Sequence, residues 1–379
     1  MGVRRLTLHD FRGYADLRLD VDARPVVLTG ANGAGKTNLI EAVSFLAPGR
    51  GLRQARLADV VRFGARPAEV GGGGWAVAAT VATAAGLVEI GTGGDGIALE
   101  RRTVRLDGTT AARQATLADV LTVTWLTPAM DRLFQEGAGG RRRFLDRLVF
   151  GFDPAHAARV SAYEHAMRER ARLLREGRAD PAWLAALERS MAEKGVAVAV
   201  ARRHLVNRLA ETSKTVLDPF PRAVPAVTGE VAAWLDEGKP ALEVEERLCQ
   251  GLARSRALDA TTGGAALGPH RGDLTVHHAG KGLPAALCST GEQKALLVSL
   301  ILAQARELRA SYGRAPVLLL DEVVAHLDEA RRLALYDVLC TLGIQAWMTG
   351  TDPFLFAPLG DQAQFFRVHD ATVTRQSPM

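Results

Sequence analysis

The chain has 379 residues, 47% of them hydrophobic and 23% charged, which is the balance of an ordinary globular protein with room for two domains. Its formal net charge is +5, so a polyanionic partner is compatible with the charge but is not established by it. Cys249, Cys288 and Cys340 lie far apart without a C-x-x-C pair, which argues against a zinc site or a disulfide scaffold. No apolar run approaches the roughly 18 residues of a membrane span, and no apolar signal segment follows Met1. We therefore expect a cytoplasmic protein with no membrane contact.

Two alternating segments open the chain. Residues 3–10 and 17–21 alternate apolar and polar side chains, which predicts two strands half buried against a core. Between them lies the sequence FRGY, residues 11–14, whose simplest interpretation is a turn with a packed aromatic ring.

Residues 26–43, VVLTGANGAGKTNLIEAV, organise the rest of the chain. Residues 26–29 predict a short buried strand, and the apolar spacing from residue 38 onward predicts a helix. The segment between them fits the P-loop pattern G-x-x-x-x-G-K-[ST], in which backbone N–H groups and a helix N-terminus surround phosphate groups. The predicted nucleotide-binding residues are Gly30, Ala31, Asn32, Gly33, Ala34, Gly35, Lys36, Thr37 and Asn38. Lys36 is expected to reach the β- and γ-phosphates of ATP, and the Thr37 hydroxyl to bind Mg²⁺. A glycine-rich turn of purely structural use is the alternative.

Residues 49–53, GRGLR, follow the predicted P-loop helix and carry two arginines. Solvated side chains and a contact to nucleotide or DNA both remain open for Arg50 and Arg53. From residue 71 to residue 110 the sequence alternates β-branched and small residues, and Gly-Gly-Asp-Gly and Asp-Gly turns interrupt it. This pattern predicts an antiparallel β meander.

From residue 129 to residue 258 the strand signals nearly vanish. Residues 154–175 and 181–217 have helical patterns, each with an Asp-Pro start that suits an N-cap followed by the first helical position. We expect these two segments to form an antiparallel helical hairpin. Residues 141–178 contain ten arginines and five acids, an excess that equals the net charge of the whole chain. A solvated helix face and a footprint for the DNA phosphate backbone both remain open.

Alternating strand and helix patterns return after residue 265. The sequence LGPHRGDL leads into a predicted strand at residues 274–278, and Ser289-Thr290-Gly291-Glu292-Gln293 opens a strongly apolar helix. Ser289 and Glu292 have the spacing of a capping box, so a well-made helix start is the simplest interpretation of this pair.

Residues 317–320 predict a buried strand, and Asp321 and Glu322 follow it directly. Ligands bind beside the carboxyl ends of strands in open α/β sheets, so these carboxylates are candidates for chemistry. Asp321 suits Mg²⁺, and Glu322 suits the general base that polarises the attacking water. Residues 344–351 predict a last apolar strand.

These motifs together resemble the ATPase heads of the ABC class, with Walker A (GANGAGKT), signature (STGEQK), Walker B (VLLLDE) and a following HLD. Within that class the sequence resembles the RecF family, through FRGY, GRGLR, RRRFLDR, LGPHRGDL and the motifs above, between residues 11 and 328. The resemblance implies an α/β head with a mixed sheet and a β meander, at residues 1–128 and 265–379. A helical lobe at residues 129–264 would be inserted into it.

The resemblance also implies a function. Heads of this kind bind ATP and Mg²⁺, form a homodimer on ATP, engage single-stranded or gapped DNA, and hydrolyse ATP slowly. Ser289 and Gly291 would then act on the ATP of the opposite subunit, with Glu322 and Lys36 as the other catalytic groups. RecO- and RecR-like proteins would be partners in recombinational repair, recombinase loading and SOS induction. ABC transporters carry a switch histidine after the last strand, and Thr349 or Thr351 is expected in its place here.

Two other classes share these motifs. An SMC-like structural ATPase needs a coiled coil of hundreds of residues, whereas the longest predicted helix here has about 37. A transporter subunit has far fewer residues between the Walker A and signature motifs than the roughly 250 found in this chain.

Overall fold

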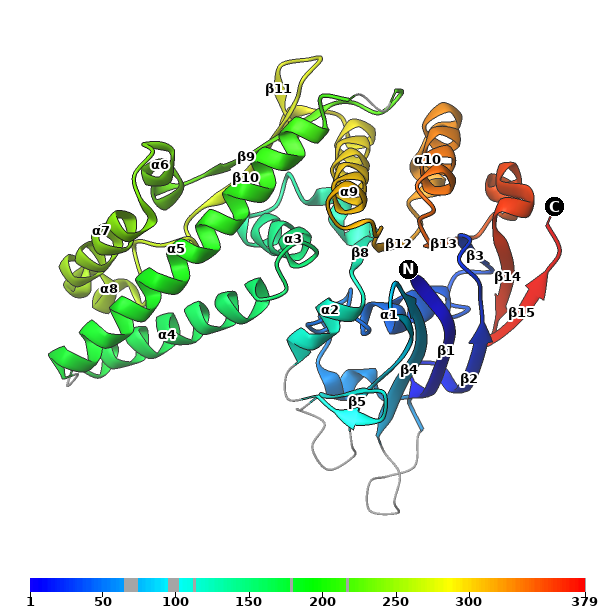
Figure 1. Cartoon of the computed structure of the whole chain (residues 1–379), viewed down its shortest axis with the longest axis horizontal. Helices are drawn as coiled ribbons and strands as arrows, with labels where there is room; N and C mark the ends of the chain where they lie inside the picture. The colour runs from blue at the N-terminus through cyan, green and yellow to red at the C-terminus, as the bar shows by residue number, and fades with distance from the viewer. Residues whose placement is uncertain (65–73, 95–101, 112–113, 178–179, 216–217, 379) are drawn as a thin grey trace. The chain divides into compact units, whose positions relative to one another are not determined.

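The computed structural model describes residues 1–64, 74–94, 102–111, 114–177, 180–215 and 218–378. The chain divides into two compact units (Figure 1). The first comprises Met1–Asp131, Val216–Pro221 and Leu297–Met379, and the second comprises Arg132–Thr215 and Arg222–Leu296. The second unit therefore extends past the boundary at residue 264 that the sequence suggests. The reason is that the strand after residue 272 pairs inside the second unit.

The first unit contains an antiparallel sheet built from the N-terminal strands and the meander. Its strands are β1 (Gly2–Phe11), β2 (Tyr14–Asp20), β4 (Trp75–Thr83), β5 (Gly86–Gly94), β6 (Thr103–Leu106) and β7 (Thr109–Thr110), in the order β2-β1-β4-β5-β6-β7. Alternate side chains such as Leu6, Leu8, Val77 and Val81 are buried, as the period of a half-buried strand requires. The predicted strands and meander are confirmed. The predicted Gly-Gly-Asp-Gly turn at residues 93–96 lies partly outside the described residues. Of the four consecutive glycines at residues 71–74, only Gly74 is described.

A second sheet of the first unit carries the motifs. It consists of β3 (Val26–Thr29), β8 (Val123–Leu126), β12 (Val317–Leu320), β13 (Ala346–Gly350), β14 (Gln364–His369) and β15 (Thr372–Gln376), in the order β15-β14-β3-β13-β12-β8. Every pair in it is parallel except β14 with β15. Parallel strands covered on both faces read as unbroken apolar runs, which is why β12 and β13 were recognisable. The expectation that β13 is the last strand is wrong, because Phe365 and Phe366 of β14 bury themselves beside β3.

Helices of the first unit pack against these sheets. They are α1 (Lys36–Ser44), α2 (Leu117–Val120), α10 (Glu329–Thr341) and, from Leu297 onward, α9 (Thr290–Tyr312). Phe11, Phe45 and Trp75 meet edge to face with ring centroids 5.1 to 5.9 Å apart, which ties the end of α1 to the antiparallel sheet. The predicted packed aromatic of FRGY is confirmed, since Phe11 and Tyr14 are buried and pair across the turn.

The second unit is mostly helical. It contains α3 (Ala138–Phe150), α4 (His156–Glu176), α5 (Pro181–Thr212), α6 (Glu230–Asp236), α7 (Ala241–Arg254) and α8 (Arg256–Thr262), with a small sheet β11-β10-β9 made by β9 (Ala223–Thr228), β10 (Asp273–His278) and β11 (Leu283–Pro284). Helices α4 and α5 lie along each other (Figure 1), as the predicted hairpin requires. Asp180 caps α5 by accepting a hydrogen bond from the Ala182 N–H at 2.8 Å.

Three expectations about this unit are wrong. Helix α5 ends at Thr212, whereas the sequence pattern predicted a helix as far as residue 217. Helix α4 begins at His156 rather than Pro154, because the Asp153 carboxylate accepts from the Ala155 N–H and closes a turn before the helix. Strand β9 was not foreseen, since Pro225 lies within it. That proline is tolerated because β9 is an edge strand, which pairs with β10 alone among the described strands, so one side of its backbone needs no partner.

Short 3₁₀ segments complete the connections: η1 (Leu57–Val60), η3 (Gln114–Thr116), η4 (Pro128–Arg132), η5 (Ala285–Leu287), η6 (Val324–His326) and η7 (Pro353–Gln362). Within the described ranges, no helix has both the length and the apolar character needed to cross a membrane.

Candidate functional site: a P-loop joined to the end of strand β12

The loop between β3 and α1 has the backbone that the P-loop pattern predicts. Gly30 and Gly35 adopt φ angles of +154° and +109°, which favour glycine, and Gly35 immediately precedes α1. A Cβ atom on Gly30 would lie 2.2 Å from the Val368 carbonyl oxygen, so only glycine fits beside β14. The Tyr14 hydroxyl donates to the Gly35 carbonyl at 3.1 Å and holds the other end of the loop. The loop is therefore fixed by two strands distant in sequence.

Lys36 is buried beneath this loop, with 4% of its surface exposed. Its Nζ donates to the carbonyls of Gly30 and Ala31 at 2.7 and 2.8 Å. Burial lowers the pKa of Lys36, while the carboxylates of Glu322 and Asp321 oppose that shift. A partly desolvated ammonium group of this kind is positioned to bind an anion strongly, because little water competes for it.

Asp321 joins the P-loop to the end of β12. Its Oδ1 atom accepts from the Thr37 hydroxyl at 3.1 Å and from the Thr349 hydroxyl at 2.7 Å. Thr349, which is fully buried at the end of β13, also accepts from the Glu322 N–H at 2.9 Å. The structure thus brings together the predicted residues Lys36, Thr37, Asp321 and Glu322.

Glu322 follows Asp321 with a φ of +53°, a left-handed conformation that costs a non-glycine residue free energy. Its bond to Thr349 is what holds that backbone in place. Of the two candidates for the switch position, Thr349 makes these contacts, whereas Thr351 is exposed to solvent.

The donor set fits a magnesium ion shared with a nucleotide. A threonine hydroxyl and an aspartate carboxylate are the protein ligands that P-loop proteins use, and phosphate oxygens and water complete the shell. No cluster of three or more His, Cys, Asp and Glu side chains within the described ranges could hold a metal by itself. The chemistry of Thr37 and Asp321 therefore suits Mg²⁺ brought by a triphosphate.

Helix α1 also carries a buried carboxylate. Glu41 is fully buried, and its carboxylate accepts hydrogen bonds from Arg12 at 2.7 and 2.9 Å and from Arg53 at 2.9 Å. Arg53 also donates to the Asn38 side-chain oxygen at 3.0 Å, one residue beyond Thr37. Arg53 is thus a structural partner of the P-loop helix, while Arg50 is exposed.

The signature segment begins α9 within the second unit. The Ser289 N–H donates to Glu292 Oε2 at 3.0 Å, and the Glu292 N–H donates to the Ser289 hydroxyl at 3.4 Å. The capping box is therefore confirmed. Lys281, on the β10–β11 hairpin, pairs with Glu292 at 2.5 Å and, together with the Ser289 bonds, lowers the pKa of Glu292 to about 2. A Cβ atom on Gly291 would have no heavy atom of the described residues within 4 Å, so the start of α9 is open at that position.

The LGPHRGDL segment packs against α4. His270 Nε2 donates to the Ala265 carbonyl at 2.9 Å, so its Nδ1 accepts from the Tyr163 hydroxyl at 2.6 Å. Burial lowers the pKa of His270, which favours this neutral form. His270 is therefore satisfied by its neighbours within the unit.

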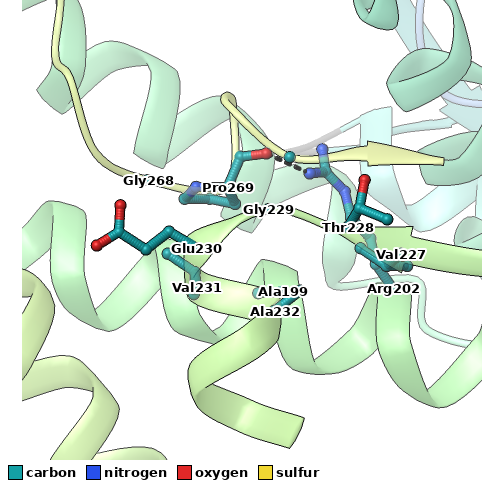
Figure 2. A pocket seen from close by; sticks show the side chains of 11 residues that line it. Ala199, Arg202, Val227, Thr228, Gly229, Glu230, Val231, Ala232, Gly268 and Pro269 are labelled. Atoms are coloured by element: carbon teal, nitrogen blue, oxygen red, sulfur yellow. Dashed lines mark hydrogen bonds between the residues drawn. The ribbon is translucent and has the colours of Figure 1, made fainter.

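A small pocket lies beside this segment (Figure 2). Arg202 lines it and donates to the Pro269 carbonyl at 2.8 Å. Gly229 and Gly272 also line the pocket, and they lie so close together that a Cβ on Gly229 would be 2.7 Å from the Gly272 Cα. Its volume of about 10 Å³ admits at most about one water molecule. This pocket is too small to hold a nucleotide.

Comparison with known proteins follows the same motifs. The family model described as "RecF/RecN/SMC N terminal domain" matches residues 2–356. Proteins named "DNA replication and repair protein RecF" from Rhizobium meliloti (strain 1021) and Agrobacterium fabrum (strain C58) are 51% and 50% identical to this chain. The alignments cover 98% of this chain and 98% of the first protein, and 99% of this chain and 98% of the second. The chain belongs to the RecF family.

The fold agrees with that of solved RecF structures. The structure titled "Structure of the recombination mediator protein RecF-ATPrS in RecFOR pathway" superimposes with a TM-score of 0.83 and 21% identity, over 99% of this chain and 98% of that one. An Smc head bound to the C-winged helix domain of ScpA superimposes less closely, with a TM-score of 0.56 and 16% identity over 100% and 98% of the two chains. This RecF-family chain thus has the predicted ABC/SMC-type head architecture.

Two residues that hold the site could not be chosen from the sequence. Tyr14 was recognised only as a packed aromatic, although its hydroxyl supports Gly35. Val368 was missed because β14 was missed, although its carbonyl dictates glycine at position 30. The alternation in residues 366–369 was the available signal for that strand.

Proposed function

We propose that this chain is an ATP-dependent DNA-binding protein of recombinational repair and replication-gap processing. One observation carries the proposal: the Thr37 hydroxyl and the Asp321 carboxylate meet at 3.1 Å beside the buried Lys36. This is the arrangement that a Mg²⁺-nucleotide needs. The names of the relatives, DNA replication and repair proteins at about half identity over the full length, support the DNA and repair part of the proposal.

In this proposal the P-loop residues Gly30 to Asn38 bind ATP. Backbone N–H groups and the start of α1 bind phosphate oxygens, and Lys36 supplies the compensating positive charge near the β- and γ-phosphates. Thr37 and Asp321 hold Mg²⁺, which neutralises charge on the phosphates when it is bound. The Thr349 and Thr37 hydroxyls both donate to Oδ1 of Asp321, so Thr349 keeps the Asp321 carboxylate oriented toward Thr37.

Glu322 acts as the general base. Its carboxylate would accept a proton from the attacking water, and its backbone is held by the Thr349 hydroxyl. Hydrolysis is slow and serves to reset the protein, so the chain is primarily an ATP-switched DNA-binding protein and only weakly a DNA-dependent ATPase.

Dimerisation on ATP completes the proposed cycle. Ser289 and Gly291, at the start of α9, would contact the γ-phosphate bound by the P-loop of a second copy. Two copies would then close on single-stranded or gapped DNA, and RecO- and RecR-like proteins would join them for recombinase loading and SOS induction. An SMC-like structural role is disfavoured, because α5, the longest helix in the described part of the chain, has 32 residues and is about 48 Å long.

The test is DNA retention with and without ATP, on single-stranded, duplex and gapped oligonucleotides at two salt concentrations. We expect ATP to increase retention by the unmodified protein, and Lys36→Met to abolish that increase. Lys214→Met removes a positive charge whose side chain is 56% exposed, and it should leave the increase intact. Equal retention by the unmodified protein with and without ATP would overturn the proposed function.

A further inference from the structure

The arginine excess of residues 141–178 is distributed unevenly in the second unit. On the exposed face of α4, Arg168 pairs with Glu164, and Arg172 pairs with both Glu169 and Glu176. These are pairs within one helix at i,i+3 and i,i+4 spacing, so the face is close to electrically neutral. Arg175 is the third arginine of this face, and its Nε donates to the Ala171 carbonyl. The three arginines are matched in number by the three glutamates, so the exposed face of α4 carries no net positive charge.

One of these arginines is buried. Arg170, only 1% exposed, pairs with Glu188 at 3.0 Å and with Asp259 at 2.7 Å. A buried arginine whose charge is compensated in this way is not available to a ligand.

The start of α3 differs from α4. Its first turn contains no acidic residue, and three consecutive arginines follow Gly140. Arg141 is neutralised by Asp273, with contacts of 2.7 and 2.8 Å. Arg142 donates to the Gly272 carbonyl at 2.8 Å, and Arg143 is exposed with no hydrogen bond or ion pair among the described residues.

Arg271 adds a third charge next to Gly272. It is exposed, and its Nε donates to the Ala265 carbonyl at 3.0 Å. We call Arg142, Arg143 and Arg271 the arginine cluster. Arg142 lies between the other two arginines. On one side it bonds to Gly272, the residue after Arg271. On the other side the guanidinium groups of Arg142 and Arg143 both lie near Gly139, since a Cβ on Gly139 would be 3.9 Å from the first and 3.4 Å from the second.

The carboxylates near the arginine cluster are already paired with other side chains. Asp273 is shared with Arg141, and Asp146 accepts two bonds from Arg202 at 2.8 Å and one from His156 at 2.8 Å. Burial and the charges of Arg202 and Arg143 lower the pKa of Arg142, against the opposing effect of those two carboxylates. Like charges held together in this way cost free energy, which an arriving anion would recover.

We propose that Arg142, Arg143 and Arg271 contact the phosphate backbone of DNA, and that the arginines on α4 do not. Planar guanidinium groups offer paired N–H donors that match phosphate oxygens. Arg143 and Arg271 are exposed and have N–H donors that no other side chain or carbonyl of the described residues occupies. This inference rests on the proposed function and names the surface of the second unit that serves it.

The experiment compares two double variants that remove the same formal charge. Arg143→Gln/Arg271→Gln removes the exposed members of the arginine cluster, and Arg168→Gln/Arg172→Gln is the matched control on α4. Both are titrated with duplex and gapped DNA in ATP at several salt concentrations. Because each phosphate that an arginine neutralises contributes about 0.9 to the log–log salt slope, the slope should become shallower by about 1.8 in the first variant and should not change in the control.

ATP affinity is measured on the same proteins and should equal that of the unmodified protein. Arg143→Gln alone removes no native side-chain bond, so it tests the cluster even if the double variant folds poorly; its slope should change by about 0.9. An unchanged slope in the cluster variants, equal slopes in the two double variants, or a loss of ATP affinity would overturn the inference while DNA binding by the unmodified protein persists. Absence of ATP-dependent DNA binding by the unmodified protein would instead refute the proposed function.

Discussion

Replacing Thr349 by valine removes the one hydroxyl that links Asp321 to Glu322. Valine keeps the shape of the fully buried side chain, so the substitution leaves no cavity. It removes the 2.7 Å bond to the Asp321 carboxylate and the 2.9 Å bond from the Glu322 N–H. In the Thr349→Val protein the left-handed backbone of Glu322 would no longer be held by a hydrogen bond from its N–H to residue 349.

The expected cost follows from these two bonds. A hydrogen bond to a charged group contributes about 1.5–3 kcal/mol, and a buried N–H left without a partner costs about 1–3 kcal/mol. Since both bonds share one hydroxyl and Glu322 is only half-buried, we expect a loss of about 3 kcal/mol in the free energy of unfolding. That is about a hundredfold change in the folding equilibrium constant.

Urea unfolding of four proteins measures this loss. Thr349→Val should lose about 3 kcal/mol, whereas Thr349→Ser retains the hydroxyl and should recover most of that stability. Thr351→Val is the neighbouring control, because Thr351 is exposed and should tolerate the change. A Thr349→Val protein within about 0.5 kcal/mol of the unmodified one would refute the role assigned to this hydroxyl.

Two further predictions follow from the packing of each unit. Gly30→Ala should abolish nucleotide binding, since its Cβ would lie 2.2 Å from the Val368 carbonyl, whereas Gly33→Ala has nothing within 4 Å and should cost only about 1–2 kcal/mol of backbone strain; equal nucleotide affinities would contradict this. Burial lowers the pKa of His270, so below its ordinary value of 6.5 the unfolded chain binds a proton that the folded chain does not. Stability should therefore fall as the pH drops from 7 to 5, and a His270→Gln protein should lose less over that range; identical pH profiles would show that His270 is not responsible.

The sequence predicted the parts of the fold that depend on neighbouring residues. The P-loop, the buried strand before Asp321 and the capping box at Ser289 are local patterns with a single geometric solution. The β meander was likewise visible, because its period and turns repeat over short distances. These patterns also identified Lys36, Thr37 and Asp321, which the structure brings together.

Features set by long-range contacts could not be predicted in the same way. Strand β9 contains Pro225 and is possible only because it forms an edge. The arginine excess of residues 141–178 suggested a charged face, but the sequence did not show that Arg170 is buried between two acids. Neither could it show that Arg271, more than a hundred residues away, lies beside Arg142 through Gly272. Such pairings depend on how the helices pack.

The most direct test of an ATP-switched protein is the oligomeric state of Glu322→Gln in the presence of ATP. The amide keeps the size of the side chain but cannot accept a proton from water, so ATP should bind and remain intact. Light scattering after size exclusion should then show a long-lived dimer that retains DNA, while the unmodified protein returns to its resting state as ATP is consumed. A Glu322→Gln protein that stays monomeric and hydrolyses ATP at the normal rate would contradict both the general base and the ATP-dependent dimer.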